Sequence, residues 1–342
     1  MQKFSIYLNR DYNSVLLTST TFIFSMFSIF GKNFCMSILI VGTVAFDAIE
    51  TPFGKTDKIV GGSGTYIGLA ASFFYGNIKL VSVVGDDFPK EMFSNFNKKG
   101  IHTEGVQVMK GKKSFFWAGR YHLDMNTRDT IKTDLNVLAD FDPVLPENYR
   151  RADYLMLGNI DPKLQIDVIE QLKVRPKLIG MDTMNYWMNN NKADLMKVIK
   201  MVDVLIINDE EARQLANEYS IAKAAKIILK MGPKFLVIKK GEHGALLFYG
   251  EEVFFAPALP LEEIFDPTGA GDTFAGGFMG YLAKTKNITY TNMKRAVIYG
   301  SALASFCVEK FGPQRLFEIK NSQVNKRVGE FVNLTKFTLK AR

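Results

Sequence analysis

Short runs of apolar residues recur along the chain and alternate with segments whose apolar residues are spaced as on one face of a helix. The apolar runs, rich in β-branched residues, are Ile38–Gly42, Lys79–Val84, Tyr154–Leu157, Lys177–Met181, Val202–Ile207 and Phe235–Lys239. The segments with helical spacing are Gly64–Phe74, Pro89–Lys98, Leu164–Leu172, Ala193–Met201, Asp209–Glu218 and Ala222–Leu229. Uninterrupted hydrophobic strands that alternate with helices are typical of a parallel sheet covered on both faces. The pattern therefore predicts an α/β fold around a mostly parallel central sheet.

Two segments, Thr51–Val60 and Val106–Thr133, break this alternation. They mix polar and apolar residues with turn formers, and they contain strand-like stretches such as Val106–Val108 and Ser114–Trp117. Alternating strands of this kind suit a sheet with one exposed face. We predict that they form a small antiparallel sheet attached to the large one.

The fold is predicted to begin at Met36, where the first buried strand opens. Residues 1–35 precede it as an extension or reflect a misassigned start. Val15–Phe30 is apolar but interrupted by Ser and Thr, and its 16 residues are fewer than the roughly 20 that a membrane-spanning helix needs. It follows Lys3 and Arg10, as in a signal peptide, but no small-x-small cleavage site comes after it. A targeting segment is the alternative interpretation, and no membrane span is expected.

The positive charge is concentrated at the two ends of the chain. Of the formal net charge of +8 over 342 residues, residues 1–35 (three basic, one acidic) contribute +2 and residues 320–342 (six basic, one acidic) contribute +5. The segment 36–319 is thus nearly neutral and lacks the clustered Lys and Arg that binding to nucleic acid requires. We expect a folded domain over 36–319, a basic C-terminal tail over 320–342 and no nucleic-acid partner.

The cysteines and histidines exclude a disulfide-stabilised domain and a structural zinc site. Two cysteines, Cys35 and Cys307, cannot form a disulfide framework, which indicates a reducing compartment, and we expect a cytoplasmic protein. His102, His122 and His243 are scattered, without the spacing of metal ligands.

Polar residues and glycines gather just past the predicted strands, where open α/β sheets bind ligands. They are Asp47, Asn159, Asp182, Asn208, Gly241 and the loop Asp266–Asp272, which follows the strand-like run Val253–Ala256. A single residue of this kind often only caps a helix or makes a turn. Their occurrence at six equivalent places predicts one ligand-binding cleft.

The strongest local feature is the run Asp266–Phe278, with the sequence DPTGAGDTFAGGF. Gly269 and Gly271 tolerate positive φ and let a ligand approach the backbone. Because Thr273–Ala283 has helical spacing, the glycine turn forms a helix N-terminus, which attracts an anion such as phosphate. Asp272, in the first turn, is placed to accept the proton of an attacking hydroxyl, as the base in phosphoryl transfer does.

Two other glycine-containing stretches resemble nucleotide motifs without meeting their requirements. Gly54–Thr56 matches the end of a P-loop, but Ile49 stands where the first glycine belongs and no buried strand precedes it. Gly62, Gly64 and Gly68 miss the dinucleotide spacing, and no acidic residue ends a second strand about 20 residues on. A nicotinamide-dependent oxidoreductase is therefore disfavoured.

The run Asp266–Phe278 closely resembles the second signature of the ribokinase-like (pfkB) carbohydrate kinase family, which also contains adenosine kinase and other nucleoside kinases. The resemblance extends over nearly all of Met36–Gln314. It implies a ribokinase-like fold, with a central mostly parallel sheet, helices on both faces, and a β-sheet lid built from insertions at about residues 49–62 and 104–133. It also implies phosphorylation by ATP with Mg²⁺. The residues implied at the transfer centre are the base Asp272, the phosphate-holding amides of Gly269, Ala270 and Gly271, and Asp266 for a monovalent cation such as K⁺.

On the acceptor side, Ile38–Asp47 resembles the family's opening strand, whose aspartate binds substrate hydroxyls. Gly61–Gly64 resembles the double-glycine turn that contacts the sugar, and Val84–Asp87 resembles the VGxD element of the family. Tyr66 stands where the family usually has an asparagine that contacts the sugar, which leaves the substrate open. The candidate acceptor residues are Asp47, Gly61, Gly62, Tyr66, Asn159 and the lid residue Arg120, with Asn126, Arg128 and Asp129 as further lid contacts.

On the nucleotide side, Asn208–Glu211 matches the N-x-x-E motif of the family, in which the asparagine reaches the phosphates and the glutamate organises Mg²⁺ through water. Lys239–Gly244 resembles the nucleotide loop, with a lysine in place of the usual hydroxyl residue. Gly300 and the residue after it lie where a helix lines the adenine pocket. The candidate nucleotide residues are Asn208, Glu211, Lys239, Gly241, Gly244 and Ser301.

The expected function is a kinase that transfers the γ-phosphate of ATP to a hydroxyl of a sugar or sugar-like small molecule. A nucleoside kinase of the same family is the alternative, favoured if Tyr66 or Phe116 stacks on a base. A non-catalytic regulatory relative is disfavoured, because a binding protein has no need of a base beside an anion site. Apart from the small-molecule substrate, the expected partner is a second copy of the chain, since an exposed lid edge often pairs.

Overall fold

The computed structural model describes residues 36–337, so the predicted extension 1–35 and its alternative as a targeting segment lie outside the described residues. The described part contains a nine-stranded sheet in the order β14-β13-β12-β11-β10-β9-β1-β5-β6. The sheet is parallel from β6 to β12, and β13 and β14 add to it antiparallel. Its strands are β1 (Ile38–Val41), β5 (Ile78–Gly85), β6 (Ile101–Met109), β9 (Tyr154–Leu157), β10 (Leu178–Asp182), β11 (Val204–Asn208), β12 (Phe235–Lys239), β13 (Ala245–Tyr249) and β14 (Glu252–Ala256). The predicted mostly parallel α/β sheet is confirmed.

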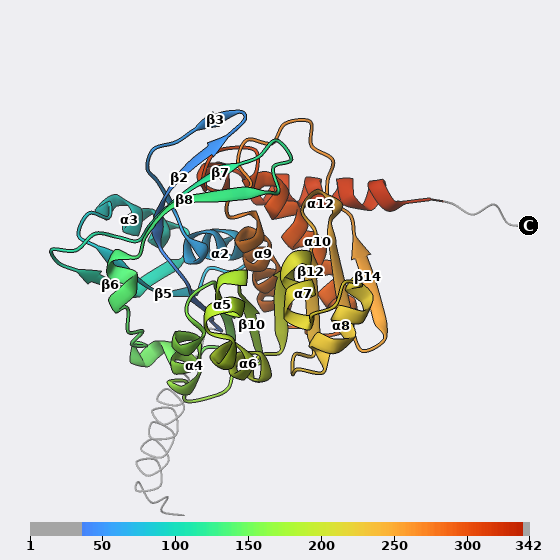
Figure 1. Ribbon diagram of the computed structural model, residues 1–342, viewed down its shortest axis with the longest axis horizontal. Helices are drawn as coiled ribbons and strands as arrows, with labels where there is room; N and C mark the ends of the chain where they lie inside the picture. Colours follow the sequence, from blue (N-terminus) through green and yellow to red (C-terminus); the bar gives the residue numbers. More distant parts are fainter. Residues whose placement is uncertain (1–35, 338–342) are drawn as a thin grey trace, which may run out of the picture. The chain divides into compact units, whose positions relative to one another are not determined.

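Helices cover both faces of this sheet because its strands are apolar on both sides (Figure 1). Along β1, Ile38 and Ile40 belong to one core, whereas Leu39 and Val41 belong to the other. The first core is closed by α2 (Ser63–Ser72), α3 (Lys90–Lys98), α9 (Ala270–Thr285), α10 (Tyr290–Cys307), α11 (Gln314–Glu318) and α12 (Asn321–Thr335). The second is closed by η1 (Asn136–Asp140), η2 (Glu147–Tyr149), α4 (Pro162–Glu170), α5 (Asn185–Asn190), α6 (Lys192–Met201), α7 (Asp209–Ala216) and α8 (Ile221–Leu229).

A second, five-stranded sheet, which we call the lid, lies at the top of Figure 1. Its strands are β2 (Ala45–Thr51), β3 (Gly54–Lys55), β4 (Ile59–Gly61), β7 (Phe116–Tyr121) and β8 (Arg128–Asp134). The order is β3-β2-β7-β8, and β4 also pairs with β2. The predicted sheet is present but is not purely antiparallel, because β2 and β7 run parallel.

The boundaries of the lid differ from the predicted insertions at about 49–62 and 104–133. The first lid strand already begins at Ala45, and Val106–Val108 belong to β6, which pairs with β5 in the large sheet. The reason is that β6 is an edge strand, with exposed residues alternating with buried ones, so its pattern resembles that of a lid strand.

The described part of the predicted basic C-terminal tail is a helix, because Asn321–Thr335 forms α12, which packs on α10. Val324 and Phe331 are both buried, and Val324 belongs to the first core. Arg327 forms an ion pair with Glu309, with 2.6 Å between Nη1 and Oε1, and its guanidinium lies 3.6 Å from the centre of the Phe306 ring. Arg327, one of the basic residues near the C-terminus, therefore helps to hold α12 against α10.

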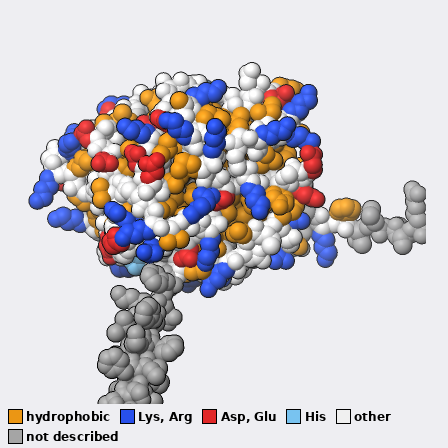
Figure 2. All heavy atoms as spheres, turned by 90° about the horizontal axis from the view of Figure 1, so that it is seen from below, with side chains coloured by type: hydrophobic (Ala, Val, Ile, Leu, Met, Phe, Trp, Pro, Cys, Tyr) orange, Lys and Arg blue, Asp and Glu red, His pale blue; other side chains and the backbone are white. Residues whose placement is uncertain are grey.

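The surface view is consistent with the nearly neutral charge of the central segment. On the face drawn in Figure 2, basic and acidic side chains are interspersed among apolar ones, without a broad area of one sign. In the part of the chain that the structure describes, no helix is both long and apolar enough to cross a membrane.

Candidate active site

Three neighbouring strands of the large sheet each end in a polar residue. β10 ends at Asp182, β11 at Asn208 and β12 at Lys239. The middle strand pairs with both others, and Asn208 is the register partner of Lys239. Because parallel strands bring their carboxyl ends to one edge, the topology places these side chains together at the edge where ligands bind.

The N-terminus of α9 lies at the same edge and begins with a turn that requires glycine. Gly269 is the N-cap with a φ of 75°, and a Cβ added there would overlap the ring of Tyr66. Asp266 anchors the turn, because its two carboxylate oxygens accept hydrogen bonds from the backbone N–H groups of Thr268 and Gly312, each at 2.8 Å. The first-turn amides of α9 are thereby held in place, where they and the helix dipole favour an anion.

Asp272 lies half-buried in the first turn of α9. Burial and the charge of Asp182 raise the pKa of Asp272 to about 7, although Lys239 and Arg128 act to lower it. A carboxyl group with such a pKa is ionised in roughly half of the molecules at neutral pH, which suits a general base.

Lys239 and Asp182 form an ion pair beside the same helix end. Lys239 Nζ lies 3.0 Å from Asp182 Oδ2, and the two side chains are 17% and 8% exposed. The same Nζ lies 2.9 Å from the position that a Cβ on Gly271 would occupy, so the ammonium group reaches the first turn of α9. Burial opposes the charged form, but Asp182, Glu211 and Asp272 outweigh it and raise the pKa of Lys239.

Glu211 is held by a capping box at the start of α7. Asn208 Oδ1 accepts a hydrogen bond from the Glu211 N–H at 2.7 Å, and the Asn208 N–H donates to Glu211 Oε2 at 2.8 Å. Burial and the charge of Asp182 raise the pKa of Glu211 to about 7, while Lys239 acts to lower it. The N-x-x-E spacing is thus the capping box itself, and it holds the glutamate near the ion pair of Asp182 and Lys239.

Asp47 is the buried carboxyl group of the lid. It lies against Gly61, where an added Cβ would overlap Asp47 Oδ2, and it accepts a hydrogen bond from the Gly62 N–H. Burial and the charge of Asp266 raise the pKa of Asp47 to about 7, with a smaller contribution from Asp272. Asp47 and Asp272 therefore interact electrostatically.

Tyr66 does not present its ring to the site. It is 1% exposed and packs against Gly269, and its hydroxyl has no hydrogen-bond partner among the described residues. Its bulk shapes the turn before α9, so Tyr66 is not available to stack on a base, one of the two contacts that would favour the nucleoside alternative.

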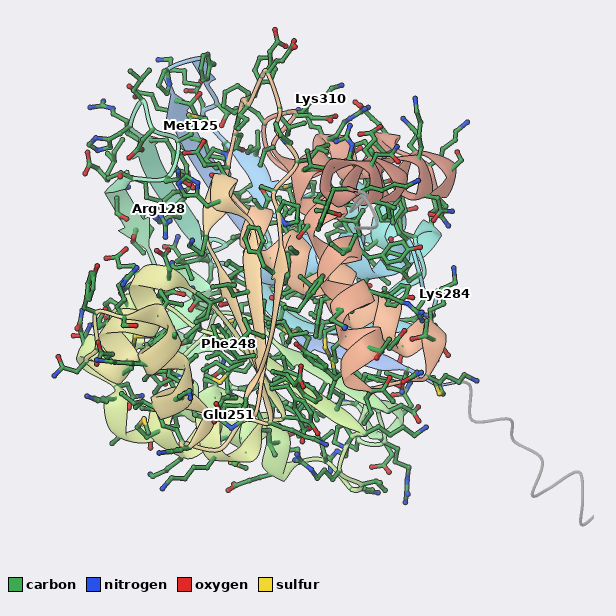
Figure 3. All side chains as sticks on the ribbon, turned by 90° about the vertical axis from the view of Figure 1, so that its right-hand side faces the viewer. Met125, Arg128, Phe248, Glu251, Lys284 and Lys310 are labelled. Atoms are coloured by element: carbon green, nitrogen blue, oxygen red, sulfur yellow. The ribbon has the colours of Figure 1, made fainter. Side chains whose placement is uncertain are left out.

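The lid reaches the α9 turn through β7, where the hydroxyl of Tyr121 lies 3.1 Å from Thr268 Oγ1. Arg128 is the register partner of Tyr121 on β8 and therefore shares its face. Figure 3 shows Arg128 on the lid, together with Met125 from the hairpin between β7 and β8. In that hairpin Asn126 packs against Gly241, so the lid also touches the loop Lys239–Gly244.

The structure does not bring Arg120 to the site. Arg120 precedes Tyr121 on β7, and successive strand residues point to opposite faces. Its Nε lies 2.8 Å from Glu50 Oε1 in an exposed ion pair. Asp129 is likewise on the surface, where its Oδ2 lies 2.9 Å from Nε2 of His122.

The ligand roles of the remaining candidates, Asn159, Gly244 and Ser301, stay predictions. Asn159 Oδ1 accepts a hydrogen bond from Trp187 Nε1 at 2.8 Å. Gly244 has a φ of 84° and faces the backbone of Ala256 so closely that no side chain fits, which is a structural reason for the glycine. Ser301 is half-buried on α10.

Trp117 lies beside Asp47 and is not among the candidate residues predicted from the sequence. It is the register partner of Asp47, so both side chains lie on one face of the lid. Its ring lies across Gly119, and its Nε1 lies 3.3 Å from Thr130 Oγ1. The spacing in the sequence does indicate that Trp117 lies on the same face as Tyr121. The two residues are four apart, and residues at even spacing along a strand lie on one face.

The chain is similar to known kinases over most of its length. A family model described as pfkB family carbohydrate kinase matches residues 37–320. The chain is 29% identical over 250 residues to a cytidine kinase from Thermococcus kodakarensis, covering 72% of this chain and 88% of that protein. It is 25% identical over 297 residues to a ribokinase from Bacillus subtilis, covering 81% of this chain and 94% of that protein.

Solved structures of the same kind share the fold. The nucleoside kinase from Burkholderia thailandensis in complex with inosine matches with a TM-score of 0.69 and 19% identity, covering 86% of this chain and 99% of that one. A putative ribokinase II from E. coli in complex with ATP and Mg²⁺ matches with a TM-score of 0.72 and 16% identity, covering the same fractions. The fold is therefore ribokinase-like, and the matched segment spans the large sheet, the lid and the α9 turn. The chain belongs to the pfkB family of carbohydrate kinases.

Proposed function

We propose that this protein transfers the γ-phosphate of ATP to a hydroxyl group of a nucleoside or sugar, with Asp272 as the general base. The observation that carries the proposal is the first turn of α9, where a carboxyl group of raised pKa, a glycine turn and the Lys239 ammonium group meet. The turn holds the phosphoryl group through backbone amides, and Asp272 takes the proton of the attacking hydroxyl. A regulatory protein without catalysis has no physical need of this combination.

For the nucleotide, Asn208 and Glu211 are proposed to face the phosphates at the ends of β11 and α7. Mg²⁺ would supply charge neutralisation for the phosphates. The described residues contain no group of three or more His, Cys, Asp or Glu side chains that could hold a metal ion. The ion would therefore be held largely by the nucleotide, with Glu211 contacting it through water. Both oxygens of Asp266 already accept backbone hydrogen bonds, so its contacts are accounted for without K⁺, and we assign no role to that ion.

Between the two acceptor classes, Trp117 favours a nucleoside. A hydroxyl-rich ring bound by Asp47 and the Gly61–Gly62 turn would lie directly beside the indole, which offers a stacking surface that a free sugar does not need. Phe116, which with Tyr66 was a stacking candidate for the nucleoside alternative, pairs in register with Phe46 and so lies on the opposite face of β7.

The acceptor can be identified by measuring ADP release with pentoses, hexoses, inositols and nucleosides. We expect nucleosides to give the highest kcat/KM, and W117A to raise the acceptor KM roughly 10-fold or more with little change in the KM for ATP, because base–aromatic stacking contributes about 1–3 kcal/mol. W117F should retain most of the affinity, and F53A, at an exposed lid position, should behave as wild type. Preferred turnover of a free sugar, insensitive to W117A, would exclude the nucleoside assignment.

The pH profile tests the base. Since the pKa of Asp272 in the free enzyme is about 7 and the reaction needs the ionised form, kcat/KM should rise with pH up to about 7 and then level off. Asp182 raises this pKa, so D182N should move the acidic limb to lower pH. A limb that stays below pH 5 in the wild type would contradict the assignment of Asp272.

Two further properties are proposed on simpler grounds. The small number of cysteines supports a cytoplasmic location, and Cys307 is buried and free. A homodimer is supported by β8, an exposed edge strand of the lid, and sedimentation analysis would test it.

A further inference from the structure

The side chain of Lys239 leaves the end of β12 and crosses to a different element. Its Nζ reaches the first turn of α9, 2.9 Å from where a Cβ on Gly271 would lie. The absence of a side chain at Gly271 provides the room that the ammonium group uses. Lys239 is thus placed at the anion-binding end of the helix that carries Asp272, and not only in the loop that follows β12.

Asp182 fixes this placement. Its Oδ2 lies 3.0 Å from Lys239 Nζ, and its Oδ1 accepts a hydrogen bond from the Thr183 N–H at 2.8 Å. The carboxylate is itself held by the backbone at the end of β10, so it is a rigid partner for a long, flexible side chain. Lys239 is therefore oriented before any ligand binds.

The ammonium group of Lys239 interacts with more carboxyl groups than the single partner of a structural ion pair. The buried ammonium group of Lys239 is paired with Asp182, with 3.0 Å between Nζ and Oδ2, and it also interacts electrostatically with the carboxyl groups of Glu211 and Asp272. Burying a charged pair generally contributes little net stability, because desolvation offsets the attraction. The nearby carboxyl groups keep the buried lysine protonated. A protonated lysine can then bind a phosphate group, which carries more negative charge than a single carboxylate.

We propose that Lys239 is a catalytic residue, whose ammonium group contacts the phosphoryl group during its transfer, and that Asp182 is the residue that positions it. The inference rests on the proposed kinase function. Lys239 donates an N–H hydrogen bond to a non-bridging oxygen of the transferred group and keeps its proton. The bond from phosphorus to the bridging oxygen of ADP breaks, the bond to the acceptor oxygen forms, and the acceptor proton passes to Asp272. The electron pair of the broken bond stays on ADP.

The experiment compares K239M with wild type in three measurements on the full chain, using the best acceptor from the screen. We expect K239M to lower kcat roughly 10²–10³-fold, as the loss of one preorganised donor to a developing anion does. The KM for ATP and the affinity for ADP with Mg²⁺, measured by calorimetry, should change less than about threefold, because the contact is made to the transferred group. Addition of fluoroaluminate, which mimics that group, should tighten ADP binding in the wild type and much less in K239M.

Controls separate this inference from simpler explanations. K226M removes the lysine of an exposed ion pair with Glu251 and should leave kcat unchanged. Retained ADP binding shows that K239M is folded, and K239R should recover part of kcat because it restores a cationic donor. A kcat of K239M within threefold of wild type, or a loss of ADP affinity that matches the loss of kcat, would overturn the assignment. Failure of the kinase function itself has a different signature, the absence of turnover by the wild type with every acceptor, and the fluoroaluminate measurement still tests Lys239 in that case.

Discussion

Replacement of Asp272 by Asn should lower kcat by roughly 10²–10⁴-fold, the usual contribution of a general base. The amide has nearly the same shape but cannot accept a proton from the attacking hydroxyl. The loss should appear in kcat and kcat/KM alike, with little change in the affinity for ADP, because the amides of the α9 turn stay in place. Initial rates of ADP formation and calorimetric binding would measure both quantities.

The stability of D272N provides an internal check on the fold. The pKa of Asp272 is raised in the folded protein, so its ionisation disfavours the folded state as pH rises from about 4 towards 7 and above. At pH 8 the Asn variant should therefore unfold at the same temperature as wild type or at a higher one. D194N removes a first-turn carboxylate from α6, away from the site, and should keep wild-type kcat. Near-normal turnover by D272N would mean that another group is the base.

Replacement of Gly269 by Ala should damage both stability and catalysis. The residue has a φ of 75°, and its Cβ would overlap the buried ring of Tyr66, so the turn before α9 must shift. We expect a loss of about 2–4 kcal/mol in unfolding free energy from strain and overlap. A displacement of the helix end by about 1 Å should lower kcat roughly 100-fold, because the phosphate-binding amides lose their alignment.

Gly111 offers a matched control for this prediction. It has a φ of 72°, but no atom lies within 4 Å of its added Cβ. G111A should therefore show the backbone strain alone, about 1–2 kcal/mol, with wild-type kcat. If thermal unfolding and kcat of G269A match those of G111A, the packing of Tyr66 against Gly269 does not govern the turn.

The local sequence was sufficient for the core of the fold. Continuous apolar runs predicted the strands of the large sheet, because a strand buried on both faces needs apolar residues at every position. The predicted lid segment wrongly includes the second half of the edge strand β6, because one face of β6 is exposed and its pattern matches that of a lid strand. Residues 321–335 form a helix where the basic charge predicts a tail, because Val324 and Phe331 lie on one face of that helix and are buried.

The same division holds at the site. The run Asp266–Phe278 by itself determined the glycine turn, the helix N-terminus and the first-turn carboxylate, because all three depend on neighbours in the chain. Only the tertiary structure decided which distant side chains reach that turn: Lys239 with Asp182, Tyr66 beneath Gly269, and Trp117 beside Asp47. It also decided that Arg120 lies on the face of β7 opposite the site, because the residues that share a face of the lid depend on the register between neighbouring strands. Backbone conformation is set by adjacent residues, whereas contact and register arise from packing between elements far apart in the sequence, and no local pattern records that packing.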